Sequence, residues 1–412
     1  MSQTPFRFVH ASDFHLERPP CGVSEVPDHL RAAFAEAPYR AVERTMDLAL
    51  SEQVDFVVLA GNLLQAEATG PRGPLFLVEQ FERLGARGIQ VYWAGGQSDP
   101  PESWPAFAPL PENVHVFPER RPEEVVHHRE GQAVARLIGL SRRKSKKLRP
   151  GDFVAAEGGP LAIAVTYGEI DRAAIANRGI QYWALGGRRR RETQSESPAV
   201  AHFPGTTQGR QPDEAGPCGC TLVEVDAGGK LRTRLAPTDV LRYRQEEIQL
   251  NEPATKQALE RLLLERLRTI AATTPGVDQL ISWTISGAAP LAAPLHRGGW
   301  SGELLTRLRN EAGYASPAAW SVSLEVESPD APNSWHQQDT LLGDYLRAIR
   351  DRLSDAEDEE PGLDLVPYLG ERQATDALAA AARLDDRSTR ERVLRKAALL
   401  GADLLRGEET PS

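Results

Sequence analysis

Short apolar runs of strand length alternate with helical patterns over the first hundred residues of the chain. The runs at Phe6–Ser12, Asp55–Gly61 and Ile89–Gly96 are rich in β-branched and aromatic residues, and the last two end in glycine. Between them, apolar residues recur at helical spacing over Asp28–Ser51 and Leu75–Leu84. Because parallel strands need crossover connections, this alternation predicts βαβ units and an α/β fold.

The middle of the chain continues with further strand patterns, at Ala133–Leu140, Leu161–Tyr167, Tyr182–Leu185 and Thr221–Val225. Open parallel sheets place their chemistry in the loops beyond the carboxyl ends of the strands. We therefore expect functional residues in the loops that begin at Asp13, Gly61, Gly95, Tyr167 and Gly186.

The pattern changes after about residue 250. An amphipathic helix is predicted over Thr255–Ala272, and strands at Gln279–Ser286 and Trp320–Val326 indicate a small α+β domain. Beyond it the pattern is helical, at Asp339–Ile349 and Arg390–Leu405. The expected division is a large α/β domain over 1–245, a small α+β domain over 250–328 and a helical region over 338–407.

Composition indicates a soluble protein of the cytoplasm. Three cysteines, Cys21, Cys218 and Cys220, are too few and too odd in number for a disulfide framework. No run of about 18 apolar residues suggests a membrane span, and no membrane partner is expected. The formal net charge is −10, and most of this negative charge lies after Leu250, which suggests that the two halves face different partners.

Asp13 and His15 form the first candidate site. They lie two residues apart at the tip of a predicted strand, so both side chains point to the same side. A carboxylate and an imidazole placed together can hold a divalent metal ion. A capping or surface role explains the pair equally well.

The loops after the strands read, in chain order, ASDFHL, VVLAGNLL, WAGGQSD and ALGGRRRR. This order resembles the calcineurin-like metallophosphoesterase superfamily, whose pattern runs DxH, GDxxD, GNHD, a lone histidine and GHxH. The stretches FRFVHASDFHLERP, QYWALGGRRRRE and HFPGTTQGRQPDEAGPCGCTLVEVD further resemble its DNA-repair exonuclease branch, the SbcD-like and YhaO-like proteins. The resemblance covers Pro5 to Val240 and implies a metallophosphoesterase-like layered α/β sandwich, followed by a small capping domain and C-terminal helices.

The same resemblance implies a site for two divalent ions that hydrolyses phosphodiesters. This chain departs from the family pattern at most of the ligand positions: Asn62 replaces the bridging aspartate, Gln97 the amide ligand, Ser98 the catalytic histidine, Tyr167 the lone histidine, and Gly187 and Arg189 the two histidines of the last motif. Arginine stays protonated and cannot ligate. A guanidinium about 5 Å from a divalent ion is repelled by roughly 6–7 kcal/mol at an effective dielectric of about 20.

We therefore expect no bound cofactor, or at most a single weakly held manganese or magnesium ion at Asp13 and His15 with Asp99 assisting. No residue is assigned as catalytic. Arginines take the place of ligands at the mouth of the site and predict phosphate or DNA binding instead: Arg188, Arg189, Arg190, Arg191 and Arg210. The alternative is that Arg188–Arg191 pair with nearby acids such as Glu192 and Glu196. A second basic run, Arg142–Arg149, reads as an exposed loop.

Three functions remain open on this basis. The first is a degenerate exonuclease homologue without nuclease activity, serving as a scaffold or DNA-sensing subunit with an SMC-like coiled-coil ATPase of the SbcC or YhaN type. The second is an active phosphoesterase or exonuclease that uses one weak metal at Asp13 and His15. The third is a polyanion-binding module without an ATPase partner.

Overall fold

The computed structural model describes residues 3–142, 149–156, 158–197, 199–250, 255–287, 299–326, 333–354, 363–368, 382–384 and 387–406. Its α-helices are α1 (Asp28–Ser51), α2 (Ala66–Thr69), α3 (Arg72–Gly85), α4 (Lys256–Thr273), α6 (Gly299–Leu308), α7 (Asn333–His336), α8 (Leu341–Ser354) and α10 (Arg387–Arg406). None of the helices among the described residues is long and apolar enough to cross a membrane.

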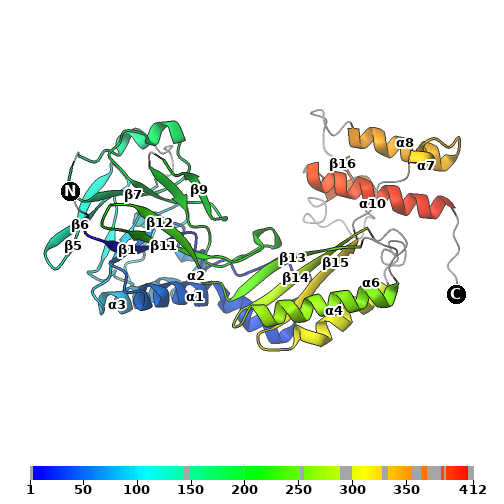
Figure 1. Ribbon diagram of the computed structural model, residues 1–412, viewed down its shortest axis with the longest axis horizontal. Helices are drawn as coiled ribbons and strands as arrows, with labels where there is room; N and C mark the ends of the chain where they lie inside the picture. The colour runs from blue at the N-terminus through cyan, green and yellow to red at the C-terminus, as the bar shows by residue number, and fades with distance from the viewer. Residues whose placement is uncertain are drawn as a thin grey trace. The chain divides into compact units, whose positions relative to one another are not determined.

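Within the described residues, the strands form two six-stranded sheets and two smaller ones (Figure 1). The first sheet has the order β12 (Leu231–Pro237), β11 (Gly219–Val225), β1 (Phe6–Ala11), β2 (Phe56–Leu59), β3 (Gln90–Trp93), β4 (Val114–Val116). The second has the order β5 (Glu123–Arg129), β6 (Gln132–Leu140), β7 (Leu161–Tyr167), β8 (Tyr182–Gly186), β10 (Val200–Phe203), β9 (Glu192–Ser195). The smaller sheets are β13 (Leu241–Gln249), β14 (Asp278–Ser286), β15 (Ala319–Val326), and β16 (Leu363–Asp364) with β17 (Arg383–Leu384).

The centre of each large sheet is parallel. In the first sheet β1, β2, β3 and β4 run parallel, with Phe8 opposite Phe56 and Val57 opposite Val91. In the second sheet β6, β7, β8 and β10 run parallel. The antiparallel strands lie at the edges. The carboxyl ends of the parallel strands therefore meet at one edge of each sheet, as the sequence predicts.

The two large sheets pack face to face over an apolar core. Phe8 and Phe56 of the first sheet are fully buried, with ring centroids 5.0 Å apart. Tyr182 of the second sheet meets Phe8 edge-on at 5.5 Å. Aliphatic side chains such as Ile163 and Val165 complete this layer. Burial of these large side chains between the sheets stabilises the sandwich, because aromatic and branched residues remove the most apolar area from water.

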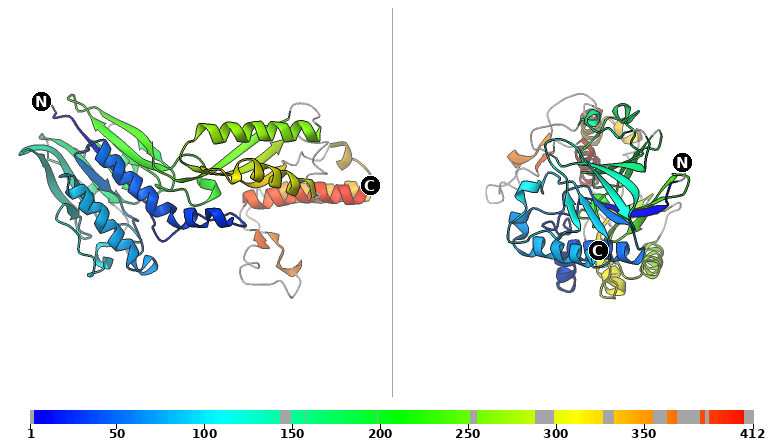
Figure 2. Two further views of the ribbon diagram at one scale, coloured as in Figure 1. Left: turned by 90° about the horizontal axis from the view of Figure 1, so that it is seen from below. Right: turned by 90° about the vertical axis from the view of Figure 1, so that its left-hand side faces the viewer.

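Helices α1 and α3 cover the other face of the first sheet, as the dark blue and lighter blue helices of Figure 2 show. Val42 and Met46 of α1 and Phe81 of α3 are fully buried against that face. The start of α1 extends beyond the sheet, where Leu30 and Phe34 pack with residues of β13, β14 and β15 in a separate cluster. The layered α/β architecture expected from the sequence is confirmed.

The described chain forms two compact units. The first comprises Met1–Gln245, Leu267–Ser282 and Arg309–Val322; the second comprises Glu246–Arg266, Trp283–Leu308 and Ser323–Ser412. The expected three-part division at 1–245, 250–328 and 338–407 stays a prediction. In the second unit α8 and α10 pack together through Leu346 and Ala402, and the Tyr345 hydroxyl donates to the Ala397 carbonyl at 2.6 Å.

Candidate functional site

Strained backbone marks the edge of the sandwich where the loops converge. Six non-glycine residues of the described chain have positive φ, and three of them are Asp13 (56°), His15 (45°) and Asn62 (58°). Such conformations cost of the order of 1–3 kcal/mol each and persist only where the surroundings impose them. The tips of β1 and β2 therefore hold the Asp13, His15 and Asn62 side chains in fixed directions.

Glycines allow the loops to approach one another at this edge. A Cβ atom on Gly186 would lie 1.7 Å from the Ala60 carbonyl oxygen, and one on Gly96 would lie 2.5 Å from the Asn62 nitrogen. The end of β8 and the loop after β3 can therefore touch the loop after β2 only because these positions carry no side chain. Residues from both large sheets reach one site as a result.

Asp13 is 2% exposed, and its carboxylate is fully engaged. It accepts hydrogen bonds from three donors: the Ser12 hydroxyl at 2.7 Å, the Asn62 amide nitrogen at 2.9 Å and the Gly187 backbone N–H at 2.8 Å. Gly187 comes from the end of β8, so this contact connects the two sheets. Asp13 is the point on which the loops of the site converge.

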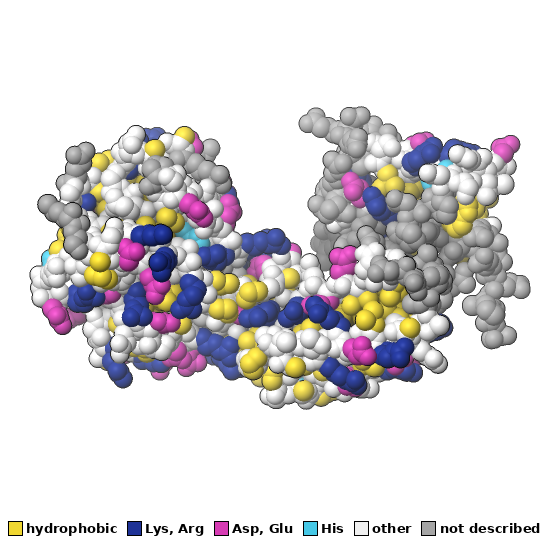
Figure 3. Space-filling model, in the orientation of Figure 1, with side chains coloured by type: hydrophobic (Ala, Val, Ile, Leu, Met, Phe, Trp, Pro, Cys, Tyr) yellow, Lys and Arg dark blue, Asp and Glu magenta, His cyan; other side chains and the backbone are white. Residues whose placement is uncertain are grey.

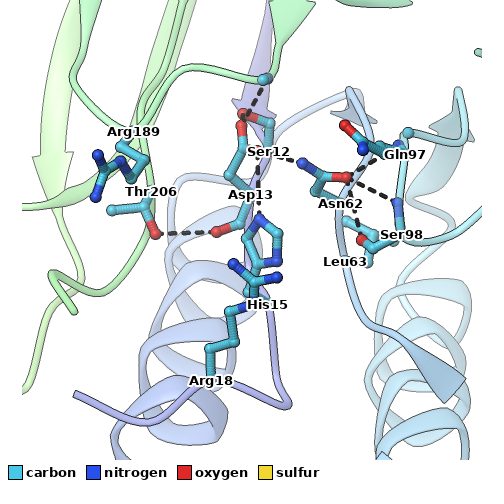
Figure 4. Close-up of polar contacts among 12 residues, drawn as sticks. Ser12, Asp13, His15, Arg18, Asn62, Leu63, Gln97, Ser98, Arg189 and Thr206 are labelled. Carbon is cyan, nitrogen blue, oxygen red and sulfur yellow. Dashed lines mark hydrogen bonds and ion pairs between the residues drawn. The ribbon is translucent and has the colours of Figure 1, made fainter. Parts of the chain in front are cut away.

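The Asn62 side chain lies between Asp13 and the turn that follows β3 (Figure 4). Its amide nitrogen donates to Oδ1 of Asp13 and, at 2.7 Å, to the Tyr167 hydroxyl. Its carbonyl oxygen accepts from the backbone N–H groups of Gln97 at 3.0 Å and Ser98 at 3.1 Å. Donors on one side and acceptors on the other fix the orientation of the amide. An aspartate at this position could donate neither bond.

Tyr167 and Gly187 fit each other sterically. Tyr167 is 8% exposed, and burial, with Asp13 nearby, raises the pKa of its hydroxyl. A Cβ atom on Gly187 would lie 2.9 Å from Cζ of Tyr167, and Gly187 has a φ of 103°. Any larger residue at position 187 would therefore collide with the tyrosine ring. Tyr167 fills space that a histidine side chain at position 187 would need.

Asp99 fixes two of the converging loops. Its carboxylate accepts backbone hydrogen bonds from Asn62 and Gly96, both at 2.7 Å, and from Leu63 at 2.9 Å. Burial raises the pKa of Asp99 to about 7, although these hydrogen bonds favour the charged form. Because both carboxylate oxygens serve backbone groups, the structure gives no support to the expectation that Asp99 assists a metal ion.

His15 is held by two carboxylates. Nδ1 of His15 lies 3.1 Å from Oε1 of Glu17, and Nε2 lies 3.7 Å from Oδ1 of Asp13. Burial alone lowers the pKa of His15, but the hydrogen bonds to Asp13 and Glu17 outweigh it and raise the pKa above its ordinary value. Both ring nitrogens of His15 therefore face carboxylate oxygens, and Glu17 is the nearer partner. Sequence reasoning missed Glu17, whose spacing of two from His15 is the signal that could have found it.

The donor set differs from that of a two-metal centre. Such centres need several carboxylates and neutral imidazoles around ions about 3.5–4 Å apart. Here the amide N–H groups of Asn62 and the hydroxyl of Tyr167 lie beside Asp13. Among the described residues, no three His, Cys, Asp or Glu side chains are arranged to hold a metal ion. The residues present do not fit a pair of divalent ions.

A cavity of about 570 Å³ opens over this network. Asp13, His15 and Asn62 line it together with three arginines, Arg18, Arg189 and Arg210. Arg18 is exposed, and its guanidinium lies near His15 in Figure 4. The structure therefore brings Asp13, His15, Asn62, Gln97, Ser98, Tyr167, Gly187, Arg189 and Arg210 together around one cavity.

Arg210 is the most deeply buried of the three arginines, at 6% exposed. Its backbone N–H donates to Oε2 of Glu214 at 2.9 Å, and its Nε lies 3.9 Å from the same oxygen. Nη1 is buried and has no hydrogen-bond partner. Burial lowers the pKa of Arg210, with Glu214 and Asp13 opposing the shift. A charged donor left without an acceptor is costly, so this nitrogen favours an anion in the cavity.

Arg189 reaches the same cavity with its side chain half exposed. Its guanidinium lies 3.0 Å from Oε1 of Glu214 and 2.9 Å from Oε1 of Gln211, with Asp213 at 3.7 Å. Sequence reasoning placed an arginine here but not these partners. The carboxylates hold Arg189 in place without burying it.

The other predicted arginines have separate partners. Arg188 pairs with Glu192 and, at 2.9 Å, with Glu169, as the pairing alternative expects for Arg188 and Glu192. Arg190 donates to the Asp213 carbonyl, and Arg191 donates to the Thr233 hydroxyl at 3.3 Å. On the body that carries the two large sheets, Lys and Arg side chains lie interspersed with Asp and Glu side chains (Figure 3). The charge pattern there is mixed.

The second basic run lies only partly within the described residues. Arg142 is described, and its guanidinium carbon lies 5.2 Å from the centre of the Tyr167 ring, with Nη1 3.3 Å from Oε1 of Gln97. Arg149 is described and exposed. Positions 143–148 lie outside the described residues. Arg142 thus adds a further cation at the rim of the cavity.

Comparison with known proteins bears on what this site is. No protein-family profile matches the chain. The chain is 29% identical over 388 residues to the uncharacterized metallophosphoesterase YhaO of Bacillus subtilis, which covers 88% of this chain and 91% of YhaO. Two solved structures show weak likeness: a protein designated a 5′-nucleotidase from Staphylococcus aureus (11% identity, 64% of this chain and 59% of that one, TM-score 0.34) and a dimetal phosphatase from Danio rerio (10% identity, 55% and 98%, TM-score 0.31).

The similarity to YhaO extends over 88% of this chain and 91% of YhaO. The layered sandwich provides the edge at which the loops around Asp13 meet. The chain is therefore similar to a metallophosphoesterase over most of its length.

Proposed function

We propose that this chain is a member of the DNA-repair exonuclease branch that binds phosphodiester groups without hydrolysing them. In this proposal a hydrogen-bond network replaces the metal pair, and arginines replace metal ions as the partners of phosphate. The protein acts in the cytoplasm as a scaffold or DNA-sensing subunit.

The position of Asn62 is the observation that carries the proposal. Its amide nitrogen contacts Asp13 and Tyr167, so neutral N–H groups occupy the place where a bridging carboxylate would face two cations. A divalent ion beside Asp13 would have to displace the donors on its carboxylate. Without ions of this kind, the site lacks the means to activate water that the two-metal mechanism uses.

Arg210 supports the binding half of the proposal. Its buried Nη1 has no hydrogen-bond partner, and its side chain lines the cavity beside Arg189. Guanidinium groups bind phosphate through charge-assisted hydrogen bonds of fixed geometry. A phosphate in the cavity would supply the hydrogen-bond acceptor that this buried donor lacks. Arginines exposed to water do not need such an acceptor, because water molecules serve that role.

An SMC-like coiled-coil ATPase is the partner that the proposal includes. The similarity to YhaO supports it only through the family resemblance. The structure adds that apolar side chains of the α8 and α10 pair are exposed, with Leu341 at 70% and Leu404 at 82%. We propose that these leucines contribute to the surface that meets the ATPase.

Two alternatives remain. A phosphoesterase that uses a single weak metal ion is favoured by the fact that Asp13 and His15 line one cavity on strained backbone. A polyanion-binding module without an ATPase would use the same arginines.

The test uses the full chain, a fluorescein-labelled single-stranded oligonucleotide and a chromogenic bis-aryl phosphodiester with added manganese. We expect oligonucleotide binding, at least tenfold weaker binding after Arg210→Ser, and no turnover of the phosphodiester.

Arg87→Ser is the matched control, because Arg87 is exposed and precedes β3 at the opposite edge of the sheet. Turnover that requires manganese and disappears in Asp13→Asn would establish the single-metal alternative. Binding that Arg210→Ser leaves unchanged would contradict the proposed site.

A further inference from the structure

A second cavity, of about 410 Å³, lies beside the first in the same unit. Three arginines and two acids line it, together with Thr206 and Gln245: Arg189, Arg190, Arg191, Asp213 and Glu214. Arg189 lines both cavities. One arginine is therefore shared by two adjacent cavities, each of which has further arginines of its own.

Backbone contacts connect the loops that carry the two cavities. The Thr206 backbone N–H donates to the Arg189 carbonyl at 3.0 Å, and the Thr206 hydroxyl donates to the Asp13 carbonyl at 2.9 Å. Gly205, at a φ of 82°, packs so closely that a Cβ atom would lie 2.8 Å from the Arg191 nitrogen. These contacts tie the arginine loop to the Asp13 loop. The spacing of the two cavities is thus set by backbone contacts.

Each cavity also retains a guanidinium beyond the shared one. In the first, Nη1 of Arg210 is buried and has no hydrogen-bond partner. In the second, Arg191 donates to the Thr233 hydroxyl, a neutral acceptor, at 3.3 Å. Arg189 itself is held by Glu214 and Gln211. In the second cavity the acids Asp213 and Glu214 are engaged by Arg189, which leaves Arg191 with only a neutral acceptor. Arginines in two adjacent cavities suit a ligand that carries two anionic groups.

We propose that the two cavities together bind two consecutive phosphates of a single nucleic-acid strand, with Arg189 between them. This inference rests on the proposed function and deepens it, because it assigns a second phosphate site and a minimal ligand. None of the lining residues of the second cavity is aromatic, so recognition runs through the phosphate backbone rather than through base stacking. Binding is therefore independent of base sequence and sensitive to salt.

The experiment compares thymidine 5′-monophosphate with the 5′-phosphorylated dinucleotide pTpT, which has two consecutive phosphates. Binding of each to the full chain is measured by calorimetry over a range of potassium chloride concentrations. We expect pTpT to bind at least tenfold more tightly. The affinity for pTpT should also fall more steeply with potassium chloride than that for the monophosphate, because salt screens more charge pairs in the pTpT complex.

Variants separate the two cavities. Arg191→Ser should remove the advantage of pTpT by weakening pTpT more than the monophosphate, while Arg191→Lys should restore much of the advantage by restoring the charge. Arg210→Ser should weaken both ligands, and Arg87→Ser should weaken neither. Circular dichroism and thermal melting confirm that each variant is folded.

Equal affinity for the two ligands, or a pTpT advantage that survives in Arg191→Ser, would overturn the second phosphate site while leaving the proposed function standing. Failure of both ligands to bind the wild-type chain would overturn the proposed function, and the two-site inference with it.

Discussion

The amide nitrogen of Asn62 lies 2.9 Å from Oδ1 of Asp13 and donates a hydrogen bond to it. Both residues are almost fully buried and both have left-handed backbone, so the contact is imposed by the loops that carry them. A neutral donor at this position needs no cation to offset repulsion from Asp13.

Replacing the amide by a carboxylate tests its electrostatic role. Asn62→Asp would place two buried carboxylates next to each other and remove the donor to Tyr167. We expect the free energy of unfolding, measured by urea denaturation at pH 7.5, to fall by about 3–5 kcal/mol. Asn177→Asp is the control, because Asn177 is exposed and also has positive φ, and it should change stability by less than about 0.5 kcal/mol. Equal stability of Asn62→Asp and wild type would contradict the role given to Asn62.

The steric relation between Gly187 and Tyr167 predicts coupled mutations. Gly187→His should destabilise strongly, because its Cβ would lie 2.9 Å from the Tyr167 ring. Tyr167→His opens that space, so part of the cost of Gly187→His should disappear in the double variant. Urea denaturation of all four proteins should give a coupling energy of at least about 1 kcal/mol. Additive effects would show that the two positions do not compete for space.

Two buried histidines should make the stability of the folded protein sensitive to acid. His10, whose Nδ1 lies 3.0 Å from the Tyr182 hydroxyl, is 0% exposed, and burial, with His202 nearby, lowers its pKa well below the ordinary value. Burial, with Arg191 nearby, lowers the pKa of His202 to about 3. The folded protein keeps both neutral, whereas the unfolded chain protonates them below about pH 6.5. Stability should therefore be complete above pH 6.5 and fall as the pH drops below it, by roughly 1.4 kcal/mol per pH unit for each histidine.

Urea denaturation between pH 7.5 and 5 measures this slope. His202→Gln can keep hydrogen bonds to Thr193 and Thr221, which His202 now contacts at 2.8 and 2.9 Å, but it cannot titrate. The variant should lose stability less steeply than wild type over this range. An unchanged slope would mean that His202 is not neutral and buried as described.

Arg210 should favour phosphate binding while it lowers the free energy of unfolding of the empty protein. Its buried, unpartnered Nη1 destabilises the empty protein, so Arg210→Met should raise the free energy of unfolding by about 0.5–2 kcal/mol. Inorganic phosphate should raise the melting temperature of wild type, as ligand linkage requires, and should not raise that of the variant. A variant that responds to phosphate like wild type would show that Arg210 does not hold the anion.

Much of the fold could be predicted because the central elements have strong patterns. The helix predicted over Asp28–Ser51 and the strand predicted over Leu161–Tyr167 have those bounds in the structure. The missed strands lie mostly at sheet edges. β9 is polar and partly exposed, and β12 alternates LRTRLAP with one face in solvent, so neither has a continuous apolar run.

The site was predictable in location but not in its contacts. The order of the loops brought Asp13, Asn62, Tyr167 and Gly187 together, as the resemblance implies. The sequence could not show that Asp99 would serve backbone N–H groups, because that depends on how two loops meet. It also could not tell Arg189 from Arg188, since the direction of each side chain depends on acids elsewhere in the chain, such as Glu214 and Glu169.

The most direct test of the central claim is the manganese stoichiometry of the full-length wild-type protein after equilibration with excess manganese and removal of free metal, measured by elemental analysis and by electron paramagnetic resonance. The account predicts well below one manganese per chain and no spin-coupled signal. Two manganese ions per chain with an exchange-coupled spectrum would show that the cleft holds a metal pair despite Asn62, and would contradict it.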